Sequence, residues 1–302
     1  MQIFQKFSQP KYFKRYLLVL GLIVTFFVIA KGQPARNAFS IADAGGGVSY
    51  EKVPEVNYTP QSQNQPVPQI SARNVFILDR NSRMVLYQKS ADQKIYPAST
   101  TKMLSALVVL DNFDLQKQII VTKSYPIGQN LNLKPGEILS VEQLLYAMLI
   151  ESANDAAEIL AENFTGGRPA FIDAMNQKAI QIHLDNSHFK NPTGIDEDGH
   201  YTTASDLTRL ADFALNNPEF SKIVATENAV IASHVVTNVN QLLGKVQGVL
   251  GVKTGFTDGA GQSLVTYINR GNHPVLIALL GSTDRFGDTE KLIDWVYKNY
   301  TW

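Results

Sequence analysis

The arrangement of apolar and polar positions divides the chain into three parts. Residues 16–30 form a continuous apolar run without a charge, residues 31–69 are polar and rich in proline, and a patterned region follows. In the patterned region, short apolar clusters typical of strands lie near both ends, and stretches with apolar residues at helical spacing lie between them. An antiparallel sheet with helices inserted in the middle of the chain predicts an α+β fold.

Turn and capping residues set the limits of the predicted elements. The turn Arg80-Asn81-Ser82 between two apolar clusters predicts a β-hairpin, and Ser140 with Gln143 forms a capping box before an apolar helix. Three adjacent strands are predicted near the C-terminal end, followed by a last helix. The predicted strands are 74–79, 84–89, 248–253, 262–268 and 274–280, and the predicted helices are 99–110, 140–149, 154–163, 169–183, 203–214 and 290–297.

The N-terminal segment has the layout of an export signal. Its apolar run of 15 residues follows four basic residues, and no acidic residue occurs before Asp43. The run is shorter than the ~20 residues that a membrane-spanning helix usually needs. One interpretation is a signal peptide cleaved after residues 28–30 or 42–44, which leaves the rest of the chain secreted. The other, which we favour, is an uncleaved anchor of residues 1–30, a single pass with its basic end in the cytoplasm and the remaining chain outside the cell membrane. The wholly basic flank argues against a buried helix of a globular domain.

Residues 31–69 are predicted to be a spacer. Five prolines occur among Gly, Gln, Asn and Ser, and residues 45–47 are all glycine. A segment of this composition cannot bury enough apolar surface to fold, and its prolines stiffen it. We therefore expect residues 31–69 to link the N-terminal segment to one folded domain of residues 70–302.

Composition excludes several classes of function. The 302 residues include 27 basic and 27 acidic side chains, and this neutral balance argues against a nucleic-acid partner. The absence of cysteine excludes disulfides, thiolate metal sites and cysteine nucleophiles. The five histidines are scattered without a metal-ligand pattern, and we expect neither a metal nor another cofactor. We interpret the acidic run Asp196-Glu197-Asp198 as a solvated loop.

The first candidate motif is Ser99-Thr100-Thr101-Lys102, preceded by Pro97. Positions i and i+3 share one face of a helix, so the Lys102 amine can lie beside the Ser99 hydroxyl. A serine hydroxyl becomes a good nucleophile when a neighbouring base removes its proton, and lysine is such a base once burial or another cation lowers its pKa. Taken alone, a Ser-x-x-Lys sequence is more often an ordinary capped helix.

The second motif is Ser152-Ala153-Asn154, which lies 50 residues after Lys102 and just beyond an apolar predicted helix. In a loop, the hydroxyl and the amide two residues apart can point into one cleft. The hydroxyl can then relay a proton, and the amide can hold a substrate carbonyl. The alternative is a loop in which Asn154 only caps the next helix.

The third motif is Lys253-Thr254-Gly255, at the end of a predicted strand. A lysine and a threonine hydroxyl at a strand edge can bind a carboxylate, and glycine lets another stretch of backbone approach closely. The backbone N–H groups of Phe256 and Ser99 can form an oxyanion hole. A solvated turn is the alternative.

The order of the three motifs is more informative than any one of them. Ser-x-x-Lys, Ser-x-Asn and Lys-Thr-Gly in sequence are the signature of serine penicillin-recognising enzymes. The chain resembles the low-molecular-mass penicillin-binding proteins, the serine-type D-alanyl-D-alanine carboxypeptidases. This resemblance implies a fold of the penicillin-binding and serine β-lactamase type, an antiparallel sheet flanked by a helical subdomain. It covers residues 70–302 and is carried by 97–107, 148–157, 191–195, 200–207, 253–257 and 260–261.

The resemblance also implies a role for each motif residue. Ser99 would be the nucleophile that forms an acyl-enzyme, Lys102 its general base, and Ser152 the group that passes a proton to the leaving D-alanine. The implied substrates are peptidoglycan stem peptides ending in D-Ala-D-Ala, with β-lactams as covalent inhibitors. The residues implied to bind the peptide or its terminal carboxylate are Asn154, Lys253, Thr254, Gly255, Phe256 and Arg285.

Other functions on the same scaffold stay open. Class A β-lactamases commonly carry a Glu-x-x-Leu-Asn loop, which does not occur between Asn163 and Lys253. A DD-endopeptidase or transpeptidase would use the same residues and differ in the shape of its groove. A non-catalytic wall-binding module usually loses the serine or the lysine, and both are present. Family members often continue into a β-rich domain with an amphipathic membrane helix, and since this chain stops at Trp302, we expect anchoring at its N-terminus.

Overall fold

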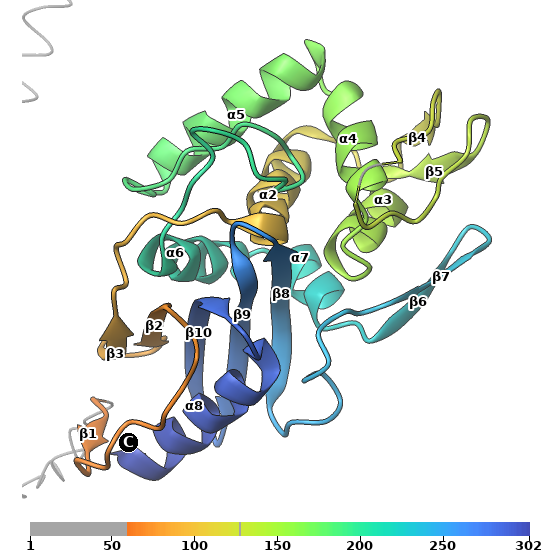
Figure 1. Ribbon diagram of the computed structural model, residues 1–302. Helices are drawn as coiled ribbons and strands as arrows, with labels where there is room; N and C mark the ends of the chain where they lie inside the picture. Colours follow the sequence, from red (N-terminus) through yellow and green to blue (C-terminus); the bar gives the residue numbers. More distant parts are fainter. Residues whose placement is uncertain (1–58, 127) are drawn as a thin grey trace, which may run out of the picture. The chain divides into compact units, whose positions relative to one another are not determined.

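A five-stranded antiparallel sheet forms the centre of the folded part of the chain (Figure 1). The computed structural model describes residues 59–126 and 128–302, so the expected anchor and most of the expected linker lie outside the described residues. The strand order in the sheet is β3-β2-β10-β9-β8. These strands are β2 (Asn74–Asp79), β3 (Val85–Lys89), β8 (Val249–Thr257), β9 (Gly261–Arg270) and β10 (His273–Ser282).

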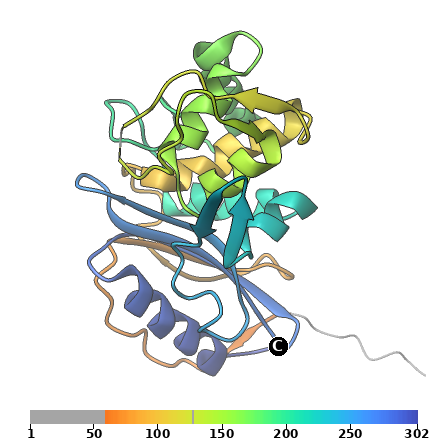
Figure 2. The same cartoon turned by 90° about the vertical axis from the view of Figure 1, so that its right-hand side faces the viewer.

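Strand β10 shows why the sheet carries an apolar core on each face. Leu276 and Ala278 belong to the core shared with the helices from the middle of the chain, whereas Val275 and Ile277 belong to the core beneath α8 (Arg285–Asn299). Because successive side chains of a strand point to opposite faces, two buried faces require the uninterrupted apolar run seen in the sequence. Figure 2 shows α8 on one face of the sheet and the other helices across it.

The helices on the other face form a subdomain that includes two small two-stranded sheets. The predicted capping box is confirmed, since Ser140 and Gln143 form it at α3. At α6, the Thr203 side chain caps the helix by accepting a hydrogen bond from the backbone N–H of Asp206. Within residues 59–126 and 128–302, no helix combines the length and the apolar composition that a membrane crossing requires. The elements are η2 (Ala98–Thr101), α2 (Lys102–Asn112), β4 (Gln118–Ile120), β5 (Ile138–Ser140), α3 (Val141–Leu149), α4 (Asn154–Glu162), α5 (Gly167–Gln181), α6 (Ala204–Ala214), α7 (Pro218–Val224), β6 (Asn228–Ile231) and β7 (His234–Thr237).

The predicted α+β class and the antiparallel sheet are confirmed, but some limits differ. Helix α7 and the two small sheets are not predicted from the sequence, because they are too short for a clear hydrophobic period. Strand β8 continues through the third motif, because its backbone pairs with β9 as far as Thr257 opposite Gly261. Helix α8 begins earlier than predicted, because the Asp284 side chain caps it by accepting a hydrogen bond from the N–H of Gly287.

Residues 61–65, which the sequence analysis places in the linker, belong to the folded part. Strand β1 (Gln61–Ser62) pairs antiparallel with β11 (Tyr300–Thr301). The indole N–H of Trp295 donates to the carbonyl oxygen of Gln65 at 3.1 Å. Polar composition did not reveal this docking, because the segment is held by backbone hydrogen bonds at the edge of α8 rather than by burial of its side chains.

Candidate active site

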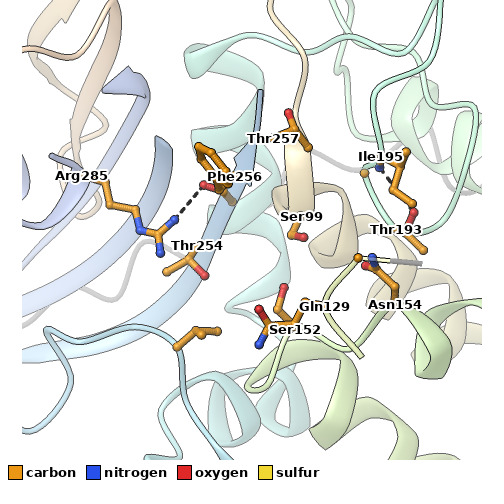
Figure 3. Close-up of a pocket in the computed structure, with 14 residues that line it drawn as sticks. Ser99, Gln129, Ser152, Asn154, Thr193, Ile195, Thr254, Phe256, Thr257 and Arg285 are labelled. Atoms are coloured by element: carbon orange, nitrogen blue, oxygen red, sulfur yellow. Dashed lines mark hydrogen bonds between the residues drawn. The ribbon is translucent and has the colours of Figure 1, made fainter. Parts of the chain in front are cut away.

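Ser99 and Lys102 lie where the chain enters the helical subdomain. The short helix η2 follows Pro97 and leads directly into α2, so the motif forms one helical turn. The Nζ atom of Lys102 lies 3.0 Å from the Oγ atom of Ser99. Lys102 is fully buried, whereas Ser99 is half-buried and lines a cavity (Figure 3). The structure thus brings together the two groups whose spacing pointed to a nucleophile and its base.

Two fixed acceptors orient the Lys102 amine. Its Nζ atom donates to Asn154 Oδ1 at 2.6 Å and to the carbonyl oxygen of Thr193 at 2.7 Å. Burial lowers the pKa of Lys102 well below 10.5, and the charge of Lys253 lowers it further. A neutral amine has two hydrogens and one lone pair. With both hydrogens directed at Asn154 and Thr193, the lone pair faces the Ser99 hydroxyl.

The Thr193 carbonyl is positioned by a turn that Asn191 organises. The Oδ1 atom of buried Asn191 accepts hydrogen bonds from the hydroxyl of Thr193 at 3.0 Å and from the N–H of Gly194 at 2.8 Å. An asparagine that binds the backbone two or three residues ahead is a common turn-forming device. In the sequence, this Asn-Pro-Thr-Gly stretch contributes only to the family resemblance, and no pattern in it predicts a contact with the base.

Gly194 allows this turn to lie against the nucleophile. Its φ is +93°, and a Cβ atom added there would lie 1.8 Å from the carbonyl oxygen of Ala98. Every residue other than glycine therefore forces the turn away from η2. This close contact fixes the position of the Thr193 carbonyl, which binds Lys102, relative to Ser99.

Ser152 and Lys253 form the second pair of functional groups. The Nζ atom of Lys253 donates to Ser152 Oγ at 2.9 Å and to the carbonyl oxygen of Thr254 at 3.2 Å. Burial and the charge of Arg285 lower the pKa of Lys253 to about 7. Ser152 has a φ of +65°, an unfavourable conformation for a residue with a Cβ atom. This conformation directs the hydroxyl to the Lys253 amine and into the cavity wall.

The cavity beside Ser99 has a volume of about 290 Å³. Both motif lysines are buried behind its wall rather than exposed in it. Of the described side chains that line the cavity, Arg285 alone is charged, and it donates to the carbonyl oxygen of Gly255 at 3.0 Å. The side of the cavity formed by Thr254 and Arg285 is therefore suited to an anionic group. The sequence-predicted residues that line it are Ser99, Ser152, Asn154, Thr254, Gly255, Phe256 and Arg285 (Figure 3).

Strand β8 approaches η2 at Gly255. A Cβ atom added to Gly255 would lie 3.0 Å from the Cβ atom of Ala98 and 3.3 Å from the backbone nitrogen of Ser99. This close approach is what an oxyanion hole built from the N–H groups of Ser99 and Phe256 requires. The oxyanion hole itself stays a prediction.

The loop of residues 128–133 contributes Gly128 and Gln129 to the cavity lining. The backbone N–H of Asn154 donates to the carbonyl oxygen of Gln129 at 2.7 Å. The buried carboxylate of Asp155 accepts hydrogen bonds from the N–H groups of Leu131 at 3.1 Å and Leu133 at 3.0 Å. The start of α4 thus fixes this loop, and Gln129 lines the cavity beside Ser152 (Figure 3). The sequence carried no signal for this contact, because the acceptor of Asn154 and the donors to Asp155 are backbone groups.

Together these groups define a class of enzyme. A half-buried serine faces a buried lysine whose pKa is lowered, a second serine–lysine pair lies beside it, and an arginine marks a site for an anion. This is a site for acyl transfer through a covalent serine intermediate. Within the described residues, no group of three or more His, Cys, Asp or Glu side chains is placed to hold a metal ion.

Comparison with known proteins agrees with this class. The family model described as D-alanyl-D-alanine carboxypeptidase matches residues 59–284, and the chain belongs to that family. The D-alanyl-D-alanine carboxypeptidase DacF of Bacillus subtilis is 30% identical over 244 residues, which are 76% of this chain and 63% of DacF. The chain therefore spans less than two thirds of the length of that relative. The family resemblance found in the sequence is confirmed.

Solved structures confirm the predicted type of fold. The D-alanyl-D-alanine carboxypeptidase of Mycobacterium tuberculosis H37Rv has a TM-score of 0.74 and 30% identity, with 79% of this chain and 96% of that chain covered. The Streptomyces K15 DD-transpeptidase has a TM-score of 0.71 and 30% identity, with 78% of this chain and 100% of that chain covered. Both similarities cover more than three quarters of this chain.

Proposed function

We propose that this chain is an exported serine DD-carboxypeptidase, which removes the terminal D-alanine from peptidoglycan stem peptides. The observation that carries the proposal is the buried Lys102 amine, whose Nζ atom is bound by Asn154 and Thr193 and lies 3.0 Å from the Ser99 Oγ atom. Family membership supports the substrate class, and the charged Arg285 in the cavity wall supports a substrate with a free carboxylate.

Acylation begins when the neutral Lys102 amine accepts the proton of Ser99. The Ser99 Oγ atom then attacks the carbonyl carbon of the penultimate D-alanine, and the backbone N–H groups of Ser99 and Phe256 stabilise the oxyanion. The peptide bond breaks, its nitrogen takes up one proton, and the terminal D-alanine leaves. Ser99 retains the acyl group as an ester, and the proton on Lys102 is available to the departing amine.

Ser152 provides the path for that proton. Its hydroxyl lies in the cavity wall and accepts a hydrogen bond from Lys253, so its own hydrogen can point toward the leaving nitrogen. Thr254 and Arg285 bind the terminal carboxylate, and buried Lys253 contributes its charge behind them. Deacylation uses water in place of the amine, with Lys102 again as the base. The products are the shortened peptide and free Ser99.

A β-lactam is a covalent inhibitor in this scheme. Its strained amide is attacked by Ser99 in the same way, but the leaving nitrogen stays tethered to the acyl group. With a peptide, the D-alanine leaves the site after acylation. With a β-lactam, the leaving group stays in the site, and the acyl-enzyme therefore persists. The family of this chain supports the proposal.

We place the catalytic domain outside the cytoplasmic membrane, held there by an uncleaved N-terminal anchor of residues 1–30 and a linker that follows. The basic flank and the apolar run in the sequence support this location. Protease treatment of intact spheroplasts tests it, since an anchored external domain is digested and sediments with membranes before digestion. A domain that appears in the culture medium would show instead that the segment is cleaved.

The decisive experiment uses the full chain in mild detergent with a labelled penicillin and an N-acylated peptide ending in D-Ala-D-Ala. We expect a stable adduct on Ser99 by mass spectrometry and release of free D-alanine from the peptide, both absent in Ser99→Ala. Consumption of penicillin without an adduct would favour a β-lactamase. A folded sample with neither reaction would favour a non-catalytic wall-binding module.

A second candidate is DD-transpeptidation, with DD-endopeptidase activity as its hydrolytic counterpart on cross-linked peptides. The similarity to the Streptomyces K15 DD-transpeptidase favours it. The acyl-enzyme is the same, and an amine rather than water then accepts the acyl group. Adding a D-amino acid at increasing concentration during peptide turnover distinguishes the two, because a carboxypeptidase yields mainly the hydrolysed product throughout.

A further inference from the structure

Asp196 lies in the loop between α5 and α6, where the sequence analysis expected a solvated acidic run. It is instead half-buried and bound on both carboxylate oxygens. The Oδ1 atom accepts a hydrogen bond from the hydroxyl of Thr257 at 2.7 Å, and the Oδ2 atom accepts one from the N–H of Gly259 at 3.0 Å. Thr257 ends strand β8, and Gly259 lies in the turn to β9. One side chain therefore joins the α5–α6 loop to the end of β8.

The contact is tightly packed on the strand side. A Cβ atom added to Gly259 would lie 2.6 Å from the Asp196 Oδ2 atom and 2.9 Å from the ring of Tyr96. The Thr257 hydroxyl also accepts a hydrogen bond from the N–H of Ala260 at 3.1 Å. The β8–β9 turn is thus closed around the Asp196 carboxylate, and its conformation depends on that acceptor.

The two segments joined by Asp196 form different walls of the catalytic cavity. The α5–α6 loop carries Ile195, which lines the cavity, and Thr193, whose carbonyl binds the Lys102 amine. Strand β8 carries Thr257 and Thr254, which line the other wall. Figure 3 shows Ile195 and Thr257 at one end of the cavity, with Ser99 between them and the end marked by Gln129 and Ser152.

We propose that Asp196 is a positioning residue for acylation, which fixes the distance between the wall that carries the base and the wall that binds the substrate. The inference rests on the proposed function, because it concerns the same site. Reacting groups must be held close to their productive geometry, and a displacement of about 1 Å can slow a reaction about 100-fold. Without the carboxylate, the β8–β9 turn loses two hydrogen bonds, and β8 can shift relative to η2.

In the proposed binding mode, loss of the Asp196 contacts affects mainly the part of the peptide that forms the acyl group. The leaving D-alanine lies near Ser152 and its carboxylate near Thr254 and Arg285. The rest of the stem peptide then extends from Ser99 toward Thr257, the end that Asp196 holds. Loss of the hydrogen bonds from Thr257 and Gly259 to Asp196 is therefore expected to slow acylation. It is also expected to raise KM for a long stem peptide more than for a short one.

The test compares Asp196→Ala with Asp196→Asn and with the matched control Asp198→Ala, a change at an exposed carboxylate two residues away in the same loop. The rate constant for acylation by penicillin, kcat and KM for D-alanine release, and the melting temperature are measured for each. We expect Asp196→Ala to lower the acylation constant tenfold or more, while Asp198→Ala stays within twofold of the parent. Asp196→Asn should recover most of the rate, because the amide oxygen can accept from Gly259 and the amide nitrogen can donate to Thr257.

A double variant identifies the route of the effect. If Asp196 acts through Thr257, then Asp196→Ala with Thr257→Val is little slower than Asp196→Ala alone. A lowered melting temperature with an acylation constant within twofold of the parent would overturn the inference, and so would effects that simply add in the double variant. An inactive parent enzyme would refute the proposed function and the inference together, whereas an active parent with an unaffected Asp196→Ala refutes the inference alone.

Discussion

Replacing Lys253 by methionine should stabilise the protein at mildly acidic pH, although the lysine belongs to the proposed site. Lys253 is 1% exposed, and burial together with the charge of Arg285 lowers the pKa of its amine from 10.5 to about 7. Keeping such an amine protonated in the folded state costs about 5 kcal/mol relative to the unfolded chain, at ~1.4 kcal/mol per pH unit. Methionine has a similar length and no charge to bury.

The loss of hydrogen bonds offsets part of this gain. The amine donates to Ser152 Oγ and to the carbonyl oxygen of Thr254, and acceptors left unpaired in a buried site cost about 1–3 kcal/mol. The unfolding free energy of Lys253→Met at pH 6 should therefore exceed that of the parent by about 3 kcal/mol. At ~2–4 °C per kcal/mol for a domain of this size, the melting temperature should rise by roughly 10 °C.

The sign of the pH dependence gives a sharper test. Above the folded-state pKa of about 7, the folded protein releases the Lys253 proton, while the unfolded chain keeps it until near 10.5. The unfolding free energy of the parent therefore rises with pH in this window by ~1.4 kcal/mol per unit, and that of the variant does not. The difference between the two proteins should shrink to near zero by about pH 9.

Thermal and urea unfolding of the full chain at pH 6, 7, 8 and 9 measure this difference. Lys245→Met is the matched control, because Lys245 is exposed and its replacement leaves no buried charge behind. The reasoning fails if Lys253→Met is less stable than the parent at pH 6, or if the difference between them does not change with pH.

The remaining predictions concern the nucleophile, the base and the turn that holds it. Ser99→Ala should abolish penicillin adducts in mass spectrometry and leave the melting temperature within a few degrees of the parent. Lys102→Arg should fail to acylate at every pH up to 10, because a guanidinium stays protonated. The acylation rate of the parent should instead rise with pH through the lowered pKa of Lys102. Measurable acylation by the arginine variant would refute the assignment of Lys102 as the base. Gly194→Ala should slow acylation at least 100-fold, because its Cβ atom would lie 1.8 Å from the Ala98 carbonyl oxygen. Gly136→Ala, which has a similar positive φ in open space, should cost only ~1–2 kcal/mol of stability and no activity.

The sequence predicts the structure correctly where the type of a side chain, its spacing or the hydrophobic period determines the contact. Ser99 and Lys102 lie on one helical turn as their spacing predicts, and the apolar run of β10 is a strand with two buried faces. The capping box at Ser140 also forms as predicted. In each case the side chain named in the sequence is the group that makes the contact.

The sequence was insufficient where a backbone group or the depth of a side chain decides the contact. The acceptor that holds Lys102 is the carbonyl of Thr193, and a carbonyl has no residue-specific signature. Lys253 is predicted to bind the substrate carboxylate, and in the structure its amine is buried and donates to Ser152, a depth that the sequence does not indicate. Asp196 was interpreted as solvated because its partners, a hydroxyl and a backbone N–H, come from 61 and 63 residues further along the chain.

The pairing of β1 with β11 determines how the domain bears mechanical load. A pull on the chain ahead of residue 59 first loads the pairing of β1 with β11. It then loads the N–H groups of Gln63 and Gln65, which donate to the carbonyl oxygen and to the Oδ1 atom of Asn299 at 2.6 and 2.7 Å. A second tie follows where the N–H of Ala72 donates to Asp288 at 3.0 Å. Asn299 and Asp288 both belong to α8, so tension passes into this helix before it reaches β2. Helix η2 and strand β8 lie outside that path, and the domain can be pulled by its N-terminal segment while the spacing of its reacting groups is preserved.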